Sequence, residues 1–173
     1  MNQKRIRKMV LSAVFCALVF SATWISVPAP SVGNVNLGDG MLLLCAWILG
    51  GPWAVAASAL GAALTDLMGA YAVYAPATLL IKACMAAVAI LLTKLLENKA
   101  NCSPRISRVL SAIVAEIVMV IGYFLYESLF LGYGMGAIAN IPFNCIQGLF
   151  GMILAVVLYE FLDKTGITSH YEP

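Results

Sequence analysis

Three amide side chains form the clearest chemical pattern in this sequence. Asn140, Asn144 and Gln147 fall within about 60° of one another if their apolar segment is helical, because each helical residue turns by about 100°. An amide both donates and accepts hydrogen bonds, so this stripe can bind the polar edge of a small molecule or join neighbouring helices. We interpret it as a binding surface, because three amides at one depth exceed what helix association requires.

Further polar and aromatic side chains occur at a similar depth in other apolar segments or in the links beside them. These candidates are Glu127, Tyr123, Lys82, Tyr74 and Asn36. Together with the amides they can hydrogen-bond a polar heteroaromatic molecule and stack on its ring. The alternative is structural: Lys82 pairs with Asp66 or Glu127, and the tyrosines form a belt at the membrane surface.

Residues suited to enzyme chemistry are scarce. The single histidine, His170, lies in a polar tail, which excludes histidine-based acid–base catalysis and histidine-rich metal sites. The glycine-containing segment 37–40 lacks the Lys and the Ser or Thr of a phosphate-binding loop, and there is no G-x-S-x-G motif. No spacing of Asp and Glu matches a metal site. We therefore predict a protein that is not an enzyme and holds neither a metal nor a cofactor.

The composition indicates that the elements that position these residues lie in a lipid membrane. The 173-residue chain is 62% apolar and 10% charged, with a mean hydropathy of +0.95, whereas soluble domains are about 45–50% apolar and about 25% charged. We expect a single integral membrane domain over 1–173. The net charge of +2 gives no basic surface for a phosphate backbone, so nucleic acid is not an expected partner.

Turn-forming clusters divide the chain into six apolar segments. They cover about 6–27, 39–49, 53–68, 76–96, 105–131 and 137–162. A helix needs about 20 apolar residues to cross a membrane, so the second and third segments are short and could form one re-entrant unit. The sequence predicts an all-α, polytopic bundle of six transmembrane helices.

The distribution of Lys and Arg predicts how this bundle is oriented. Basic residues precede the first segment, surround the link between the fourth and fifth, and follow the sixth, whereas the links 28–38, 69–75 and 132–136 contain none. Because basic residues are retained on the cytoplasmic side, both termini should face the cytoplasm. The candidate binding residues then converge in the outer half of the membrane, and only Glu116 sits close to its midplane.

Small residues supply a second signal. Ala13 and Ala17 are one turn apart on the first segment and permit close approach of another helix, either within this chain or in another subunit. Ala54, Ser58 and Ala62 lie similarly on the third segment, where internal packing is the favoured interpretation.

Several short motifs, in this order, resemble the substrate-binding S component of an energy-coupling factor (ECF) vitamin importer, in the group around riboflavin and pyrimidine or pyridoxine binders. They are Asn36-Leu37-Gly38-Asp39, Asp66, Tyr74-Ala75-Pro76 with Thr78 and Lys82, and Ile141-Pro142-Phe143-Asn144 with Gln147 and Gly151. With the six-span plan, the resemblance covers nearly the whole chain.

The resemblance implies a multi-pass protein of the bacterial cytoplasmic membrane that binds a vitamin on the outer side. It implies association with a transmembrane coupling (T) protein and two ATPase subunits, with Ala13 and Ala17 contacting the coupling protein and the subunit toppling to release its substrate. The absence of Arg in the outer half disfavours ligands with a carboxylate or phosphate, which leaves pyridoxine, a hydroxymethylpyrimidine or riboflavin. A stand-alone, proton-coupled transporter is the main alternative, followed by a membrane enzyme or a structural protein.

Overall fold

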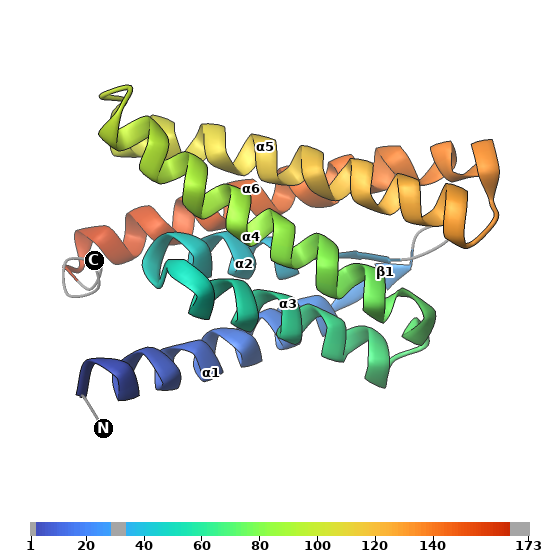
Figure 1. Ribbon diagram of the computed structural model, residues 1–173, viewed down its shortest axis with the longest axis horizontal. Coiled ribbons are helices and arrows are strands. Elements are labelled where there is room, and N and C mark those ends of the chain that lie inside the picture. The colour runs from blue at the N-terminus through green and yellow to red at the C-terminus, as the bar shows by residue number, and fades with distance from the viewer. Residues whose placement is uncertain (1–2, 29–33, 167–173) are drawn as a thin grey trace.

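The computed structural model describes residues 3–28 and 34–166, so the predicted polar tail with His170 lies outside the described residues. This part of the chain contains six α-helices that run back and forth along an elongated bundle (Figure 1). Their bounds are α1 Gln3–Trp24, α2 Gly38–Ile48, α3 Gly51–Met68, α4 Ala75–Asn98, α5 Pro104–Leu125 and α6 Ile141–Lys164. The predicted all-α, six-helix architecture is confirmed.

The bundle has two distinct ends. Helix α1 begins and α6 ends at one of them, which we call the termini end (Figure 1). A short antiparallel hairpin of β1 (Ser26–Pro28) and β2 (Asn34–Asn36) lies at the other, which we call the hairpin end. Successive helices run in opposite directions, so the links between them alternate between these two ends.

The short helix α2 occupies the centre of the bundle. It contacts α1, α3, α4 and α6, and Leu42, Leu43 and Cys45 are completely buried. A helix that is apolar on every side is stable where other helices surround it. Its 11 residues span only about 16 Å, so the predicted short second segment is a central core helix. Gly50 and Gly51, both with positive φ, turn the chain directly into α3.

Four helical stretches in the described part of the chain are long and apolar enough to cross a membrane. They are Arg5–Trp24, Ala72–Asn98, Pro104–Phe130 and Gly134–Lys164. Each has many side chains on its outer surface that are apolar and exposed, such as Leu80, Ile117 and Phe161. Such surfaces suit contact with lipid.

The first helix ends earlier than predicted. It stops at Trp24 rather than at Val27, and Val27 pairs with Val35 in the hairpin. Pro28 restricts the preceding residue to an extended conformation, and β-branched Ile25 and Val27 favour a strand. The hairpin places Asn34 in the lining of the pocket described below and Asn36 beside Gln147 of α6.

Two irregular helices flank the link between α5 and α6. Residues Tyr126–Phe130 form a π-helix, η2, and Gly134–Asn140 form a 3₁₀-helix, η3. The regular helix α6 therefore begins at Ile141 instead of residue 137, and Pro142 occupies its first turn, where a missing N–H does no harm. Asn140 consequently belongs to η3 rather than to α6.

Helices α1 and α3 approach each other closely through small residues. A Cβ atom on Gly61 would lie 2.6 Å from the carbonyl oxygen of Cys16. Ala54, Ser58 and Ala62 are all buried, so the interpretation of internal packing for the third segment is confirmed.

Candidate ligand-binding site

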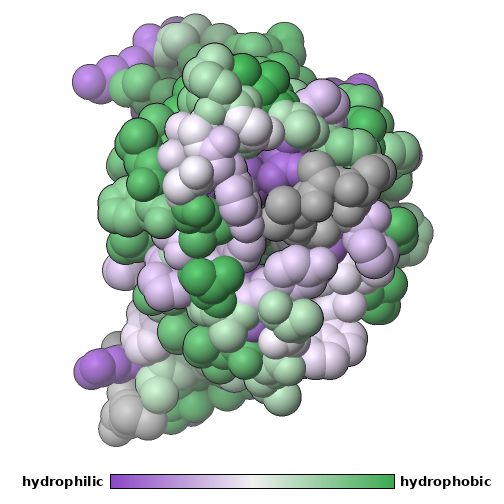
Figure 2. Space-filling model, turned by 90° about the vertical axis from the view of Figure 1, so that its right-hand side faces the viewer, coloured by the Kyte–Doolittle hydropathy of each residue, from purple (hydrophilic) through white to green (hydrophobic). Residues whose placement is uncertain are grey.

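A small pocket opens at the hairpin end. Its volume is about 50 Å³. Residues from eight helices and strands and from one link line it: Asn34, Asp66, Tyr71, Tyr74, Thr78, Tyr123, Glu127, Asn140, Phe143 and Asn144. Figure 2 views the molecule from this end, where hydrophilic residues gather in the middle of the face and hydrophobic residues surround them.

Glu127 is a buried polar group of the pocket that two neighbouring side chains hold in place. It is only 3% exposed, and its two carboxylate oxygens accept hydrogen bonds from the Asn140 amide at 2.8 Å and from the Tyr74 hydroxyl at 3.3 Å. The π-helical turn η2 carries Glu127, and such turns often occur at functional sites because they redirect a side chain.

A second set of hydrogen bonds joins α3, α4 and α5 beside Glu127. The Thr78 hydroxyl donates to an Asp66 carboxylate oxygen at 2.5 Å. The Tyr123 hydroxyl lies 3.0 Å from the same Thr78 oxygen. Asp66 and Glu127 are therefore two hydrogen-bond acceptors in one small pocket, held by different neighbours.

Tyrosine rings form the aromatic side of the pocket. Tyr74 lies at their centre, with ring centroids 6.2 Å from Tyr71, 6.4 Å from Tyr123 and 5.7 Å from Tyr126. Aromatic pairs favour tilted or edge-on geometry at such distances. A flat heterocycle that enters the pocket would meet this cluster of rings.

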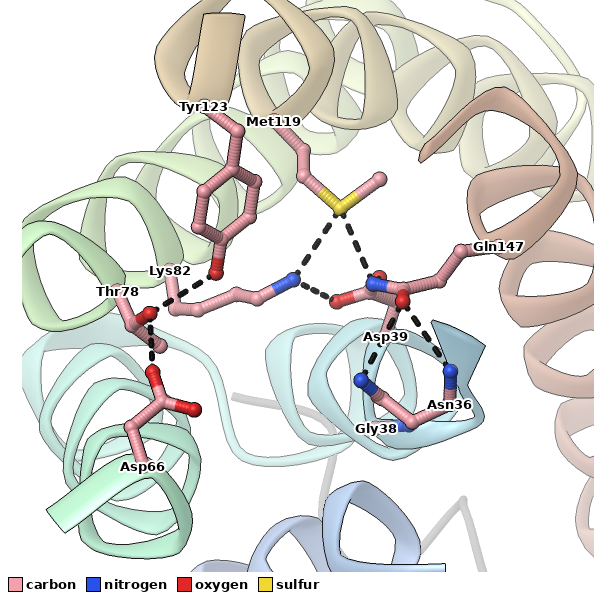
Figure 3. Close-up of polar contacts among 9 residues, drawn as sticks. All are labelled: Asn36, Gly38, Asp39, Asp66, Thr78, Lys82, Met119, Tyr123 and Gln147. Atoms are coloured by element: carbon pink, nitrogen blue, oxygen red, sulfur yellow. Dashed lines mark hydrogen bonds and ion pairs between the residues drawn. The ribbon is translucent and has the colours of Figure 1, made fainter. Parts of the chain in front are cut away.

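A lower polar layer lies about one helical turn away from the pocket residues Thr78 and Tyr123 on the same helices, and Figure 3 shows its contacts. We use this name for Asn36, Asp39, Lys82, Met119 and Gln147. Lys82 pairs with Asp39, which is completely buried, and the Gln147 amide donates to the other Asp39 oxygen at 2.6 Å. The Gln147 oxygen accepts from the Asn36 backbone N–H at 3.1 Å. Lys82 and Gln147 both also contact the Met119 sulfur.

The expectation that Lys82 pairs with Asp66 or Glu127 as a structural contact is wrong. Asp66 bonds to Thr78, and Glu127 bonds to Asn140 and Tyr74, so Asp39 is the partner of Lys82. Asp39 belongs to the lower polar layer, although it was not among the candidates from the sequence. Its position in the Asn36–Asp39 motif was the available signal, but nothing in the sequence showed that α2 lies at the centre of the bundle.

Glycines allow the lower polar layer to assemble. A Cβ atom on Gly151 of α6 would lie 2.8 Å from the Asp39 Cβ, and one on Gly38 would lie 2.1 Å from the Thr23 hydroxyl oxygen. Helices α2 and α6 are therefore close enough for Gln147 to reach Asp39. Gly151, which follows Gln147 by one helical turn, lets the two helices approach each other.

The structure divides the eight predicted site residues into two groups. Tyr74, Tyr123, Glu127, Asn140 and Asn144 line the pocket. Asn36, Lys82 and Gln147 belong to the lower polar layer. The pocket also includes five residues that were not among the candidates: Asn34, Asp66, Tyr71, Thr78 and Phe143. That any of these residues binds a ligand stays a prediction.

Comparison with known proteins identifies the family. A model of the ECF-type riboflavin transporter S component matches residues 3–164. The chain belongs to this family. It is 29% identical over 174 residues to the thiamine precursor transporter HmpT of Lactococcus lactis subsp. cremoris (strain MG1363), with 99% of this chain and 96% of that protein covered. It is also 30% identical over 149 residues to an uncharacterized protein of Pyrococcus woesei, with 86% and 95% covered.

A solved structure of the S component of a bacterial ECF transporter has the same fold. The TM-score is 0.70 at 23% sequence identity, with 93% of this chain and 98% of that chain covered. Membership of the family confirms that this chain is a multi-pass membrane protein, the substrate-binding S component of an ECF importer for a vitamin or vitamin precursor, and not an enzyme. S components bind vitamin substrates and associate with a T protein and an ATPase module.

Proposed function

We propose that the pocket captures a single-ring heteroaromatic vitamin precursor that carries an amino group, of the hydroxymethylpyrimidine type. The supporting observation is the charge of the pocket: Asp66 and Glu127 line it, and no Lys or Arg is among its lining residues in the described chain. Carboxylates accept hydrogen bonds from an exocyclic amine, and the bonds are stronger when the acceptor is charged. The tyrosine cluster provides a surface for the ring.

The size of the pocket supports a single ring over a larger ligand. A volume of about 50 Å³ is small beside the several hundred Å³ of a pocket for a drug-sized molecule. Riboflavin has three fused rings and a polyol chain, and pyridoxine has one ring but no amine. The relative whose name gives a substrate class is a transporter of a thiamine precursor, in agreement with this choice.

Calorimetry with the purified subunit tests the substrate. Hydroxymethylpyrimidine, pyridoxine and riboflavin are titrated in turn, and we expect the first to bind most tightly. Glu127→Gln should weaken its binding by about 1.5–3 kcal/mol, because a hydrogen bond to a charged acceptor is lost. Glu97→Gln, at the termini end, is the matched control. Tighter binding of riboflavin, or equal affinity in Glu127→Gln, rejects this substrate.

We further propose that the hairpin end faces outward, that both termini are cytoplasmic, and that α1 contacts the coupling protein of a module with two ATPases. The supporting observation for the contact is the exposure pattern of α1: Ala13 and Ala17 are exposed, whereas Phe15 and Val19 pack inward. An exposed pair of small residues one turn apart gives a partner helix room for close approach. The basic residues near the termini end support the orientation.

A further inference from the structure

A second, larger cavity lies at the termini end of the bundle. Its volume is about 560 Å³, and the ends of α2, α4 and α6 and the start of α5 bound it. The charged and aromatic part of its lining consists of Lys94, Glu97, Arg108, Trp47 and Tyr159. It shares no residue with the ligand pocket at the hairpin end.

Aromatic side chains hold one wall of this cavity in place. Tyr159 is 4% exposed and packs edge-on against Trp47, with ring centroids 6.0 Å apart. The Trp47 indole N–H donates to the Ser111 hydroxyl at 3.3 Å, and Thr93 donates to the same oxygen at 2.8 Å. Side chains from α2, α4, α5 and α6 thus fix this wall through direct contacts.

Two cations of the cavity have neither an ion-pair nor a hydrogen-bond partner in the described chain. The guanidinium carbon of Arg108 lies 3.9 Å from the centre of the Tyr159 ring, so the ring supports the guanidinium plane. Within residues 3–28 and 34–166, neither the Arg108 guanidinium nor the Lys94 ammonium makes an ion pair or a hydrogen bond. Arg105, by contrast, is outside the lining and pairs with Glu160 at 2.7 Å. With Glu97 as the one carboxylate in the lining, the cavity has a net positive charge.

We propose that this cavity binds a phosphate group, which belongs to the headgroup of an anionic phospholipid or to a soluble phosphate ester. A guanidinium held in a fixed plane can donate two parallel hydrogen bonds to phosphate oxygens, and an ammonium adds a point charge. Basic pockets between transmembrane helices on the cytoplasmic side suit anionic lipid headgroups, and we propose that this end faces the cytoplasm. Ile48, Leu49 and Ile90 also line the cavity, which suits the glycerol and first methylenes of a lipid.

Trp47 can report whether the cavity is occupied. The chain has three tryptophans, so Trp24→Phe and Trp53→Phe leave Trp47 as the single fluorophore. In the lipid arm, the protein is placed in phosphatidylcholine nanodiscs with a minor fraction of acyl-brominated phosphatidylglycerol or, as control, of acyl-brominated phosphatidylcholine. In the soluble arm, pyrophosphate is titrated onto the detergent-purified protein. Trp47 emission is read in both arms.

The proposal predicts a response in at least one arm. Stronger quenching by phosphatidylglycerol than by phosphatidylcholine assigns the phosphate to a lipid, and a saturable response to pyrophosphate assigns it to a soluble ester. Equal quenching by both lipids together with no response to pyrophosphate overturns the proposal.

Charge variants decide whether the response comes from this cavity. Lys94→Gln and Arg108→Gln should each weaken the apparent affinity about fivefold, whereas Arg105→Gln should leave it unchanged. Circular dichroism and the unfolding temperature establish that each variant is folded. Lys94 is exposed and forms no ion pair or hydrogen bond with a described residue, so its variant keeps the test decisive if Arg108→Gln unfolds. An equal loss in Arg105→Gln overturns the proposal, because it would show general attraction to a basic surface.

Discussion

Asn144 is the residue whose surroundings point most directly to ligand contact. It lines the pocket, is partly buried, and makes no hydrogen bond to any described residue. Its neighbours on the stripe differ, because Asn140 donates to Glu127 and Gln147 donates to Asp39. An amide with unused donors and acceptor at the edge of a pocket can bind a ligand without disturbing the protein.

Asn144→Ala should therefore weaken ligand binding and leave folding intact. We expect a loss of about 1–3 kcal/mol, because a buried polar atom of the ligand is left without its partner. Calorimetry gives the affinity and thermal unfolding gives the stability, with the exposed amide Asn98→Ala as control. Unchanged affinity in Asn144→Ala would remove this residue from the site.

The ion pair of Lys82 and Asp39 should contribute to stability in a different way. Both side chains are buried, and Lys82→Met leaves the Asp39 carboxylate without its cation. Breaking such a pair costs about 3–5 kcal/mol, whereas replacing both charges is much less harmful. We expect Lys82→Met to lower the unfolding temperature strongly and the double variant Lys82→Met/Asp39→Asn to recover most of it. If the double variant is no more stable than the single one, the two charges do not act as a pair.

At the residue scale, the sequence identified polar positions but not their partners. The stripe of amides followed from helical spacing alone, and its three members do point into the bundle. The pairing of Lys82 with Asp39 did not follow, because it depends on a contact between residues 43 positions apart. Local pattern carries no information on which distant helix supplies a counter-ion.

At the scale of elements, regular helices were predictable and their irregular ends were not. The apolar segments located all six helices of the described chain, because lipid-exposed backbone must form its hydrogen bonds within a helix. The hairpin, η2 and η3 escaped notice for two reasons: residues 34–36 and 134–136 were placed in links without regular structure, and the mostly apolar residues 126–130 and 137–140 also suit a regular helix. These irregular segments carry Asn34, Glu127 and Asn140 into the pocket.

The close contact between α1 and α3 gives a prediction at this scale. Gly61→Ala would place a methyl group 2.6 Å from a backbone carbonyl of α1, so the helices must move apart. We expect destabilisation of about 1–3 kcal/mol, typical of overpacking. Gly136→Ala is the control, because a Cβ there meets nothing within 4 Å. Equal unfolding temperatures for the two variants would show that α1 and α3 adjust without cost.

Substitutions on the outer face of α1 should impair coupling to the importer without changing ligand binding. Ala13→Trp or Ala17→Trp adds bulk to an exposed face, so we expect uptake by the complete importer to fall while ligand affinity of the isolated subunit stays the same. Cys84→Trp, at an exposed position on α4, controls for bulk facing the membrane. Normal uptake in both alanine variants would move the coupling contact to another face.

At the scale of the whole molecule, one end of the bundle carries the proposed ligand pocket and the other carries most of the charge. The pocket, the tyrosine cluster and the lower polar layer all lie toward the hairpin end. Lys94, Arg105, Arg108 and Lys164 lie toward the other. The sequence predicted this division from two signals, the basic residues near one end of the spans and the depth of the candidate binding residues near the other, because charge distribution along a membrane protein follows its topology. It did not predict the central position of α2, since a short apolar segment fits a re-entrant unit equally well.

The position of the pocket at one end of the bundle also bears on whether this subunit can concentrate its substrate alone. Glu116 of α5 is the one described residue that argues for an independent transporter: it is buried, and neither carboxylate oxygen has a hydrogen-bond partner in the described chain. A buried carboxylate near the middle of a span can carry a proton. It lies beside an apolar groove lined by Ile113, Ile117, Val120 and Leu149 and is near enough to the Lys82–Asp39 pair to interact with its charges, but it does not line the ligand pocket.

We therefore expect proteoliposomes that contain only this protein to bind the labelled precursor without accumulating it, with or without a pH gradient. Secondary transporters place substrate and ion sites together near the midplane, between two internal repeats, whereas here the pocket lies at one end of a single bundle. Accumulation should begin when a coupling protein, its ATPases and internal ATP are supplied, and Glu116→Gln should not change it. Uptake by the subunit alone that follows the pH gradient and is lost in Glu116→Gln would instead establish proton coupling through that carboxylate.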